Sequence, residues 1–324
     1  MTRDALLGYL PNADSSRHLY ELLGDYPRRT GKMMRPSICI ATARAFGANP
    51  ADAVHSAVAI ELLHNAMLVH DDIQDGSASR RGSPTLHVLH GVPLAINAGD
   101  ALFLLSLRPL LDNVDRVGGV LSLRILREME TVAWHSLEGQ AIELGWIREN
   151  VLELSDADYL NMVLRKTCWL STIHPCRIGA LIGSRGTINL EPFIRFGFYL
   201  GAAFQIQDDL LNLAPDPRYG KEINGDLLEG KRSLLLVHAY NHCSSAERSK
   251  LTKLFQRPRE QRTEEDVDWV LSLMAAYGSV QYVGRFAHAL AGAALHEFDL
   301  IYGNLPVSKD KKFIQGLANW IFQR

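Results

Sequence analysis

Two clusters of acidic residues carry the strongest chemical signal in this chain. Residues 70–75 read HDDIQD and residues 207–212 read QDDLLN, each inside an apolar stretch with helical periodicity. Because residues i and i+4 share one face of a helix, Asp71 and Asp75 would point in the same direction. Carboxylates placed together on an apolar helix repel one another and destabilise it unless a cation neutralises them. Oxygen ligands of this kind suit Mg²⁺, which bridges carboxylates to substrate phosphates.

Alternative roles for the two acid clusters suit the sequence less well. A solvated acidic face or a helix N-cap would account for one aspartate pair, but two pairs with apolar flanks favour a metal site. A calcium loop that starts at Asp71 would need Glu at its twelfth position, where the chain has Gly82. Zinc would need a Cys or HExxH context, which His64 and His70 lack.

Basic residues recur next to the acid clusters and between them. Arg and Lys are the usual partners of phosphate oxygens, so these elements predict two anionic ligands, one bridged by metal and one held by cations alone. Each element by itself would also suit an ordinary surface cation. Gly31 and Lys32 do not form a Walker A loop, because the upstream glycine and the following Ser or Thr are missing. The elements are GKMMRP at 31–36, RRG at 80–82, KT at 166–167, GK at 220–221 and GKRS at 230–233.

Helical periodicity dominates the sequence that must position these residues. Residues 53–69 place apolar side chains at steps of three and four. Alternating β-branched runs are nearly absent, which argues against a sheet. No repeat and no Gly/Ser linker divides the chain. We therefore expect an all-α fold in a single domain over residues 1–324. Further helices are expected within 119–145, 156–183, 191–213, 231–241 and 263–299.

The bulk composition is that of an ordinary globular protein. An apolar fraction of 47%, a charged fraction of 22% and a formal net charge of −2 argue against disorder and against a nucleic-acid-binding surface. Four cysteines without CxxC spacing predict free thiols in a reducing compartment. The N-terminus lacks the apolar core of a secretory signal, and apolar runs such as 101–105 fall short of the ~20 residues of a membrane span. We expect a cytoplasmic protein without a membrane span.

Taken together, these motifs resemble the trans-isoprenyl diphosphate synthases, also called the polyprenyl synthetase family. The resemblance covers nearly the whole chain and implies a prenyltransferase that condenses isopentenyl diphosphate with an allylic prenyl diphosphate and releases diphosphate. It also implies the isoprenoid synthase fold, with many helices around a deep central cavity, and a homodimer. The matching segments are GKMMRP, ELLHNAMLVHDDIQD, RRGSPT, NAGDALF, EGQAIEL, KT, FQIQDDLLNL and GKEINGDLLEGKRS.

The resemblance implies a role for each matching residue. Asp71 and Asp75 would ligate Mg²⁺ from one helix and Asp208 from a facing helix, with about three ions shared with the allylic diphosphate. Support through waters or hydrogen bonds would come from Asp72, Asp209 and Asp226. The allylic diphosphate would be held by Arg80, Lys166, Thr167, Gln205, Lys221 and Lys231. Isopentenyl diphosphate would be held by Lys32, Arg35, His64 and Arg81.

A few positions depart from the family pattern. Asn212 stands where many members have Asp, so we do not expect it to be a strong metal ligand. Ser233 replaces a common Thr, which is a mild change. Trp169 places a bulky ring shortly after Lys166, where smaller residues are frequent, and the sequence offers no reason for it.

The resemblance also implies that product length depends on the side chains one helical turn below Asp71. Ala66 is small and Met67 is flexible, so neither would close the cavity as an aromatic ring would. One helical turn deepens a cavity by ~5.4 Å, about one isoprene unit, so we expect a product of about C20, geranylgeranyl diphosphate, or longer. Alternatively, Ala66 is only a good helix former.

Two other functions compete with this interpretation. A class I terpene cyclase also ionises a prenyl diphosphate with acid clusters and Mg²⁺, but it needs no second diphosphate site. Lys32, Arg35, His64 and Arg81 indicate such a second site. A non-catalytic subunit of a heteromeric synthase would tend to have eroded aspartate clusters, whereas both clusters persist here.

Overall fold

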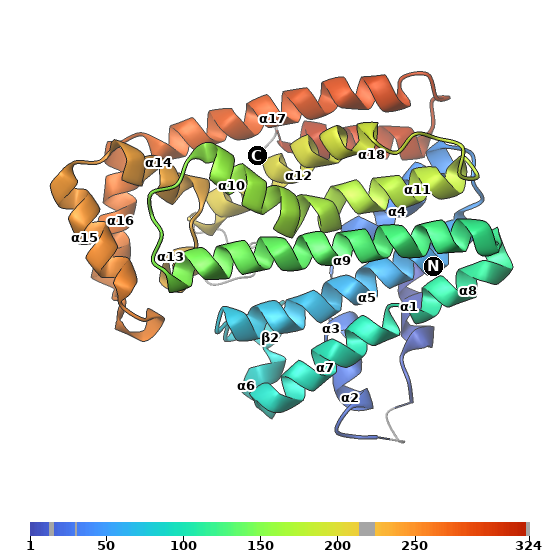
Figure 1. Cartoon of the computed structure of the whole chain (residues 1–324), viewed down its shortest axis with the longest axis horizontal. Helices are drawn as coiled ribbons and strands as arrows, with labels where there is room; N and C mark the ends of the chain where they lie inside the picture. Colours follow the sequence, from blue (N-terminus) through green and yellow to red (C-terminus); the bar gives the residue numbers. More distant parts are fainter. Residues whose placement is uncertain (13–15, 30, 214–223, 322–324) are drawn as a thin grey trace. The chain divides into compact units, whose positions relative to one another are not determined.

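The protein is almost entirely helical (Figure 1). Its structure is a computed structural model that describes residues 1–12, 16–29, 31–213 and 224–321. Within these ranges the only strands are the short β1 (Ser79–Arg80) and β2 (Ser83–Pro84), which pair antiparallel. The predicted all-α fold class is confirmed.

The chain divides into two compact units, each packed mainly on itself. A single domain over residues 1–324 and a central cavity therefore stay predictions. Unit 1 comprises Met1–Ala133, Leu170–Gly197 and Glu297–Gly316, and unit 2 comprises Trp134–Trp169, Phe198–His296 and Leu317–Arg324.

Unit 1 contains the N-terminal helices and both strands. Its helices are α1 (Thr2–Tyr9), α2 (Tyr20–Leu23), α3 (Asp25–Arg28), α4 (Met34–Ala45), α5 (Pro50–Gln74), α6 (Leu86–His90), α7 (Val92–Leu105), α8 (Arg108–Val117) and α11 (His174–Gly183). It also includes parts of α9 (Gly119–Arg148), α12 (Pro192–Asn212), α17 (Ser279–Tyr302) and α18 (Lys309–Ile321).

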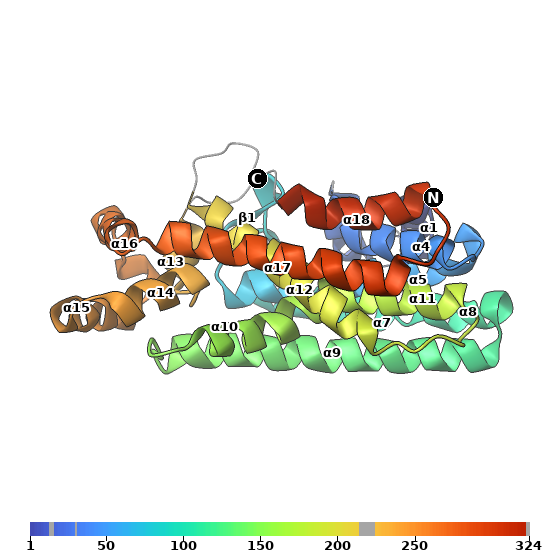
Figure 2. The same ribbon diagram turned by 90° about the horizontal axis from the view of Figure 1, so that it is seen from above.

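Unit 2 contains the remaining parts of those long helices. A π-helix, η2 (Leu164–Ile173), follows α10 directly and contributes its first residues to this unit. Helix α14 packs on α10 and on α16 (Figure 2). The helices that lie wholly in unit 2 are α10 (Asp156–Val163), α13 (Gly225–Glu229), α14 (Leu234–His242), α15 (Ser245–Gln256), the 3₁₀ turn η3 (Arg259–Gln261) and α16 (Glu264–Ala276).

Helix α5 carries the first acid cluster, and its sequence explains both of its ends. Asn49 caps the N-terminus, because its side chain accepts a hydrogen bond from Ala51 N at 3.0 Å. Pro50 occupies the first helical position, where a missing N–H costs nothing. Asp75 is the C-cap, and Gly76 follows with a φ of +63°, a left-handed conformation that ends the helix.

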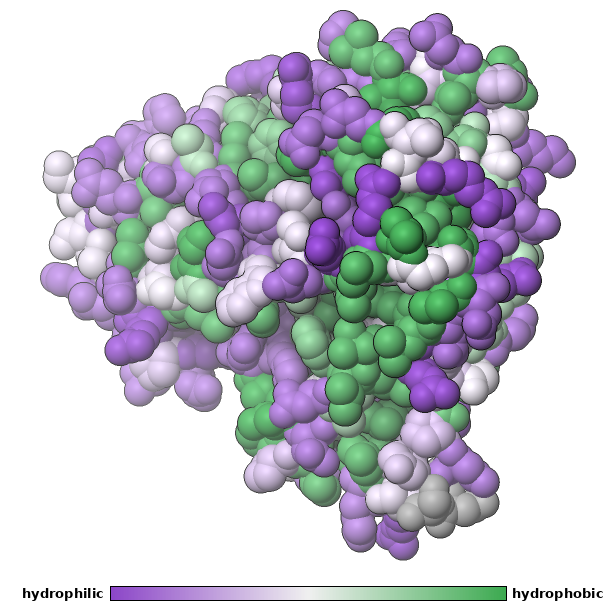
Figure 3. Space-filling view, turned by 45° about the vertical axis from the view of Figure 1, so that its right-hand side comes forward, coloured by the Kyte–Doolittle hydropathy of each residue, from purple (hydrophilic) through white to green (hydrophobic). Residues whose placement is uncertain are grey.

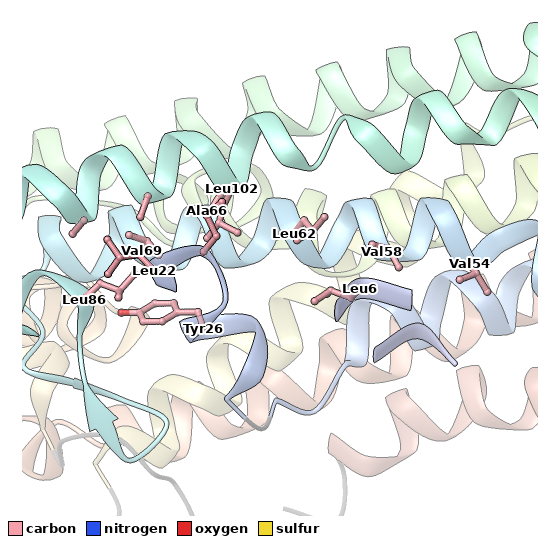
Figure 4. Packing of buried hydrophobic residues seen from close by; sticks show 13 residues of the cluster. Leu6, Leu22, Tyr26, Val54, Val58, Leu62, Ala66, Val69, Leu86 and Leu102 are labelled. Atoms are coloured by element: carbon pink, nitrogen blue, oxygen red, sulfur yellow. The ribbon is translucent and has the colours of Figure 1, made fainter. Parts of the chain in front are cut away.

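One face of α5 packs into the hydrophobic core of unit 1 (Figure 4). Side chains on this face recur at steps of three and four, the helical period that the sequence predicted. They are Val54, Val58, Leu62, Ala66 and Val69. Their partners in the cluster include Leu6, Leu22, Tyr26, Leu86 and Leu102. The end of α5 that bears the aspartates is thereby fixed against α3, α6 and α7.

Helices α4 and α11 approach each other closely because α11 presents glycines to α4. A Cβ on Gly179 would lie 2.4 Å from Cys39 O, and one on Gly183 would lie 2.6 Å from Ala43 O. Both positions therefore need glycine. This close packing fixes α4, whose first turn carries Arg35, within unit 1.

Candidate active site

The first acid cluster consists of two outer carboxylates and one inner carboxylate. Asp75 N donates to Asp71 O at 2.8 Å, so the helical geometry continues and the two side chains start from one face of α5. Both are partly exposed. Asp72, one position further round the helix, is only 1% exposed. The cluster therefore offers oxygen ligands at the surface and buries one carboxylate behind them.

Asp72 is the centre of a buried hydrogen-bond network. Arg80 Nε donates to Asp72 Oδ1 at 2.9 Å, and the Tyr26 hydroxyl donates to Asp72 Oδ2. Arg80 Nη2 also lies 3.6 Å from Asp71 Oδ2. Burial by itself would lower the pKa of Arg80, but the hydrogen bonds and charge of Asp72, together with the charge of Asp71, raise this pKa overall. Arg80 is therefore held, fully charged, against the acid cluster.

A second group in unit 1 is mainly cationic. Arg35 Nη1 lies 3.0 Å from His64 Nε2, and Arg35 Nη2 donates to Ser171 Oγ at 2.7 Å. Burial lowers the pKa of Arg35 to about 10, and the charge of Arg81 acts in the same direction while Glu61 opposes it. Burial, followed by the charges of Arg35 and Arg81, also lowers the pKa of His64 well below its ordinary value. His64 is therefore neutral at pH 7 and accepts the hydrogen bond from Arg35.

Two members of this group were not recognised from the sequence. Glu61 is 4% exposed and lies one helical turn before His64; burial raises its pKa, while the charges of Arg35 and Arg81 lower it. An acid at i−3 from a predicted site histidine is a signal that was available in the sequence. Ser171 is 4% exposed and separated from Arg35 by 136 positions, so no local pattern would have identified it.

The second acid pair lies on α12, in the part of that helix that belongs to unit 2. Asp209 is 7% exposed and accepts hydrogen bonds from the Tyr159 hydroxyl and from Gln205 Nε2, both at 2.8 Å. Thr167 Oγ1 donates in turn to Gln205 Oε1 at 3.0 Å. Burial, and then the charge of Asp226, raises the pKa of Asp209 to about 7. Asp208 is less buried than Asp209.

The predicted lysines of unit 2 both form ion pairs. Lys166 Nζ donates to Glu143 on α9, a residue that is 5% exposed and that was not predicted as a site residue, although it stands in the EGQAIEL motif. Lys231 Nζ lies 2.6 Å from Glu229 and 3.3 Å from Asp226. These carboxylates orient both ammonium groups.

Close packing of α9 on η2 positions Lys166. A Cβ on Gly139 would lie 2.1 Å from Lys166 N, so only glycine fits there. The unexplained Trp169 belongs to the same contact, because its ring stacks on that of His135 of α9 with centroids 4.3 Å apart and planes inclined by 17°. The bulky ring is thus a packing contact between η2 and α9.

The predicted site residues lie in more than one group within each unit. Unit 1 brings together the first acid cluster, Arg80, Arg81, Arg35 and His64, with Lys32 exposed. Unit 2 brings together Asp209, Gln205 and Thr167, and separately Lys231 with Asp226. Lys221 lies outside the described residues.

Comparisons with known proteins show which family and fold the chain shares. The chain is similar to the short chain isoprenyl diphosphate synthase of Methanothermobacter thermautotrophicus, at 34% identity over 81% of this chain and 76% of that protein. Its structure is similar to geranylgeranyl pyrophosphate synthetase from Pyrococcus horikoshii Ot3 (TM-score 0.87, 30% identity, 100% and 95% of the two chains). It is also similar to a polyprenyl synthase from Caulobacter crescentus CB15 complexed with calcium and isoprenyl diphosphate (TM-score 0.86, 25% identity, 100% and 93%).

The protein is therefore a transferase of prenyl groups with the isoprenoid synthase fold. The family description "Polyprenyl synthetase" matches residues 16–274. The chain belongs to the polyprenyl synthetase family, as its motifs predicted. Further relatives are named geranylgeranyl and geranylfarnesyl diphosphate synthases.

The raised pKa of Asp209 generates a prediction about stability. Because burial and Asp226 raise this pKa to about 7, the folded protein keeps a proton on Asp209 that the unfolded chain releases above about pH 4. The stability that this residue contributes is therefore present below about pH 4 and is lost as the pH rises to about 7. Asp209→Asn should remove this pH dependence and raise the unfolding temperature at pH 8 in EDTA.

Asp268→Asn is the matched control, since Asp268 is exposed on α16. It should leave the pH dependence of the unfolding temperature unchanged. An Asp209→Asn variant that loses stability between pH 4 and 8 as steeply as the wild type would contradict the assignment.

Proposed function

We propose that this chain condenses isopentenyl diphosphate with an allylic prenyl diphosphate in a Mg²⁺-dependent reaction that releases diphosphate. The observation that carries the proposal is the arrangement of charge in unit 1. There, Arg80 is bound to the first acid cluster, while Arg35 and Arg81 form a second, mainly cationic group. A metal-bridged diphosphate suits the first group, and a diphosphate held by side-chain cations suits the second.

The second group suits isopentenyl diphosphate because too little negative charge surrounds its partly buried cations. Burial lowers the pKa of Arg35 and of Arg81, and the negative charge of Glu61 offsets this decrease only in part. The buried Arg35 Nε has no hydrogen-bond partner among the residues that the structure describes. An incoming diphosphate would supply acceptors and charge at the same time. Arg35, Arg81, His64 and the exposed Lys32 are the residues to which we assign this role.

The donor set of the acid clusters fits Mg²⁺. Asp71, Asp75 and Asp208 offer carboxylate oxygens, the ligands that this hard cation prefers. In the described part of the chain, no group of three or more His, Cys, Asp or Glu side chains is arranged to hold a metal ion by itself. This suits a cation that completes its coordination with substrate phosphates and waters. When bound, Mg²⁺ would stabilise the negative charge of the departing diphosphate.

The chain's own contribution to the reaction is binding and electrostatics. Arg80, Lys166 and Lys231 would place fixed positive charge on the diphosphate that leaves the allylic carbon, with Thr167, Gln205 and Lys221 as further ligands. Arg35 and Arg81 would hold isopentenyl diphosphate so that its double bond meets the allylic carbon. The departing diphosphate would take the proton that the condensation releases.

The mainly cationic group of unit 1 helps to distinguish a prenyl synthase from the two competing functions. A terpene cyclase would not need Arg35, His64 and Arg81 together at a partly buried site, and a non-catalytic subunit would not need two intact acid pairs. The purified protein should be incubated with Mg²⁺ and C5, C10 or C15 allylic starters, with and without isopentenyl diphosphate, and the products separated by chromatography. Conversion of the starter without isopentenyl diphosphate would indicate a cyclase, and no conversion at all would contradict the proposal.

A homodimer is supported by the surface of unit 1. Figure 3 shows hydrophobic side chains gathered on one face of the molecule, and patches of this kind mark interfaces. Light scattering should give twice the chain mass of 36.1 kDa, and a monomer would contradict the proposal. Exposed large apolar residues of α6 to α9 in unit 1 are Val88, Leu89, Val92, Ile96, Phe103, Leu104, Leu111, Val114, Val120, Leu123 and Leu126.

The same helices include the stretch Val92–Val117. Among the described residues it is the one stretch that is long and apolar enough to cross a membrane, with 39% of its most apolar window buried. We assign its exposed apolar side chains to a second copy of the chain. The cytoplasmic location stays a prediction.

Product length is proposed to depend on Met67 more than on Ala66. Ala66 is 1% exposed and belongs to the core cluster with Leu102, so a larger side chain there would overpack the core (Figure 4). Met67 is partly exposed and stands one turn before Asp71. The names of the relatives support a product of C20 or longer.

Replacing Met67 tests this assignment. Met67→Phe should shift the main product to about C15, because a rigid ring shortens the space by about one isoprene unit, whereas Met67→Leu should keep the wild-type product. Chromatography of the products after Mg²⁺-dependent turnover measures both. A fully active Met67→Phe enzyme with an unchanged product would reject this account of chain length.

Removing an outer carboxylate tests the metal assignment. Asp71→Asn and Asp208→Asn should each lower kcat by about a hundredfold or more, because charge on the departing diphosphate is no longer stabilised. Circular dichroism should show an unchanged helical fold, and Asp268→Asn should retain activity. Near-normal turnover in either variant would remove the basis of the proposal.

A further inference from the structure

The two adjacent arginines of unit 1 are carried by a very short hairpin. Strands β1 and β2 pair Ser79 with Pro84 and Arg80 with Ser83, which leaves Arg81 and Gly82 as a two-residue turn. Both turn residues have positive φ, +54° and +77°, as a type I′ turn requires. A pair of strands this short is not stable by itself. Other parts of the protein must therefore hold it in place.

The two arginines of the hairpin belong to different groups, Arg80 to the first acid cluster and Arg81 to the mainly cationic group. Arg80 is bound to Asp72 and lies near Asp71. Arg81 Nη1 donates instead to Tyr26 O at 3.3 Å, and its guanidinium would lie 3.0 Å from a Cβ on Gly31. A shift of the hairpin backbone would therefore displace both guanidinium groups together.

Arg29 holds this backbone. Its Nη1 donates to Arg80 O at 2.9 Å and to Ser83 O at 3.3 Å, and its Nη2 donates to Pro84 O at 2.7 Å. One guanidinium thus bonds carbonyls on both strands. The guanidinium is itself fixed, because it lies 4.6 Å from the centroid of the Tyr26 ring and forms an ion pair of 2.6 Å with Asp25. Only 9% of the Arg29 side chain is exposed.

Tyr26 contributes a second connection from α3. Its hydroxyl donates to Asp72, its carbonyl accepts the hydrogen bond from Arg81, and its ring lies against Arg29. The segment from Asp25 to Arg29 therefore contacts the inner carboxylate, both hairpin strands and the second arginine. A displacement of this segment would therefore move the guanidinium groups of Arg80 and Arg81 together.

We propose that Arg29, supported by Tyr26, is a positioning residue that sets Arg80 and Arg81 at once, and thereby couples the recognition of the two diphosphates. This inference rests on the substrate roles proposed above for Arg80 and Arg81. Arg29 itself touches neither substrate in this account. Arg29 can position the hairpin because its planar guanidinium donates hydrogen bonds to several carbonyls at once. The single ammonium group of a lysine could not bond the same set of carbonyls.

The test is Arg29→Lys, which keeps the charge and removes the fork. We expect KM to rise about fivefold or more for both isopentenyl diphosphate and the allylic diphosphate, with kcat changed less than about twofold. Arg28→Lys is the matched control, because Arg28 is the preceding residue and is exposed. It should leave both KM values at the wild-type level.

Tyr26→Phe provides a second variant that removes only one hydroxyl. It should raise KM for the allylic diphosphate, since Asp72 and Arg80 lose a partner, and leave KM for isopentenyl diphosphate unchanged, since the Tyr26 carbonyl remains. In a double-mutant cycle with Arg80→Lys, the effect of Arg29→Lys on KM for the allylic diphosphate should be less than additive.

The outcomes separate this inference from the site assignment. If Arg80→Lys and Arg81→Lys alone leave both KM values unchanged, the proposed substrate roles are wrong. If those variants behave as expected but Arg29→Lys changes only thermal stability, or raises KM for one substrate alone, Arg29 is a fold-stabilising residue and the inference is overturned. Parallel increases in both KM values at retained thermal stability would support it.

Discussion

The constraint on which this structure depends is the burial of charge within apolar helices. Asp72 is 1% exposed, and an ionised carboxylate at such a position costs several kcal/mol unless it is paired and hydrogen-bonded. Arg80 and the Tyr26 hydroxyl supply that compensation. The need to satisfy Asp72 therefore ties α3, α5 and the β1–β2 hairpin to one another, and it orients the arginine to which we assign diphosphate binding.

The same local solution occurs at both acid pairs. The inner residue, Asp72 in unit 1 and Asp209 in unit 2, is buried and accepts a hydrogen bond from a buried tyrosine, Tyr26 or Tyr159. The outer residue precedes it by one position and thus points about 100° away around the helix axis. A fixed inner carboxylate orients the helix end, and the outer one is more exposed and is the residue that we assign to the cation. Within each Asp-Asp pair, the inner residue therefore has a structural role, and the outer residue has the chemical role that we propose.

Much of the fold and the nature of the site were predictable from the sequence. The period of apolar residues over 53–69 predicted a helix, and α5 confirms it. The aspartate and arginine motifs led to the family, because unusual residue types stood at short, regular spacings. The pairing of Arg80 with the first acid cluster also follows from proximity, since eight positions separate Arg80 and Asp72.

What the sequence could not reveal are contacts between distant segments. Ser171 binds Arg35 across 136 positions, and Arg29 reaches Pro84 across 55. Neither belongs to a motif, because their roles arise only from tertiary packing. Glu143 lies within the EGQAIEL motif but was overlooked, since its acidic side chain is explained only once Lys166 is seen beside it. Trp169 looked anomalous for the same reason until His135 was found stacked on it.

The central claim is that one diphosphate is bound through a metal and the other through side-chain cations alone. Isothermal titration calorimetry tests this claim directly. The two ligands are isopentenyl diphosphate and a non-reactive allylic thiolodiphosphate, in which sulfur replaces the oxygen between carbon and phosphorus. Each is titrated in Mg²⁺ and in EDTA. We expect EDTA to weaken binding of the allylic analogue by about tenfold or more, while isopentenyl diphosphate binds within about threefold of its affinity in Mg²⁺. Equal dependence of both ligands on Mg²⁺, or of neither, would contradict it.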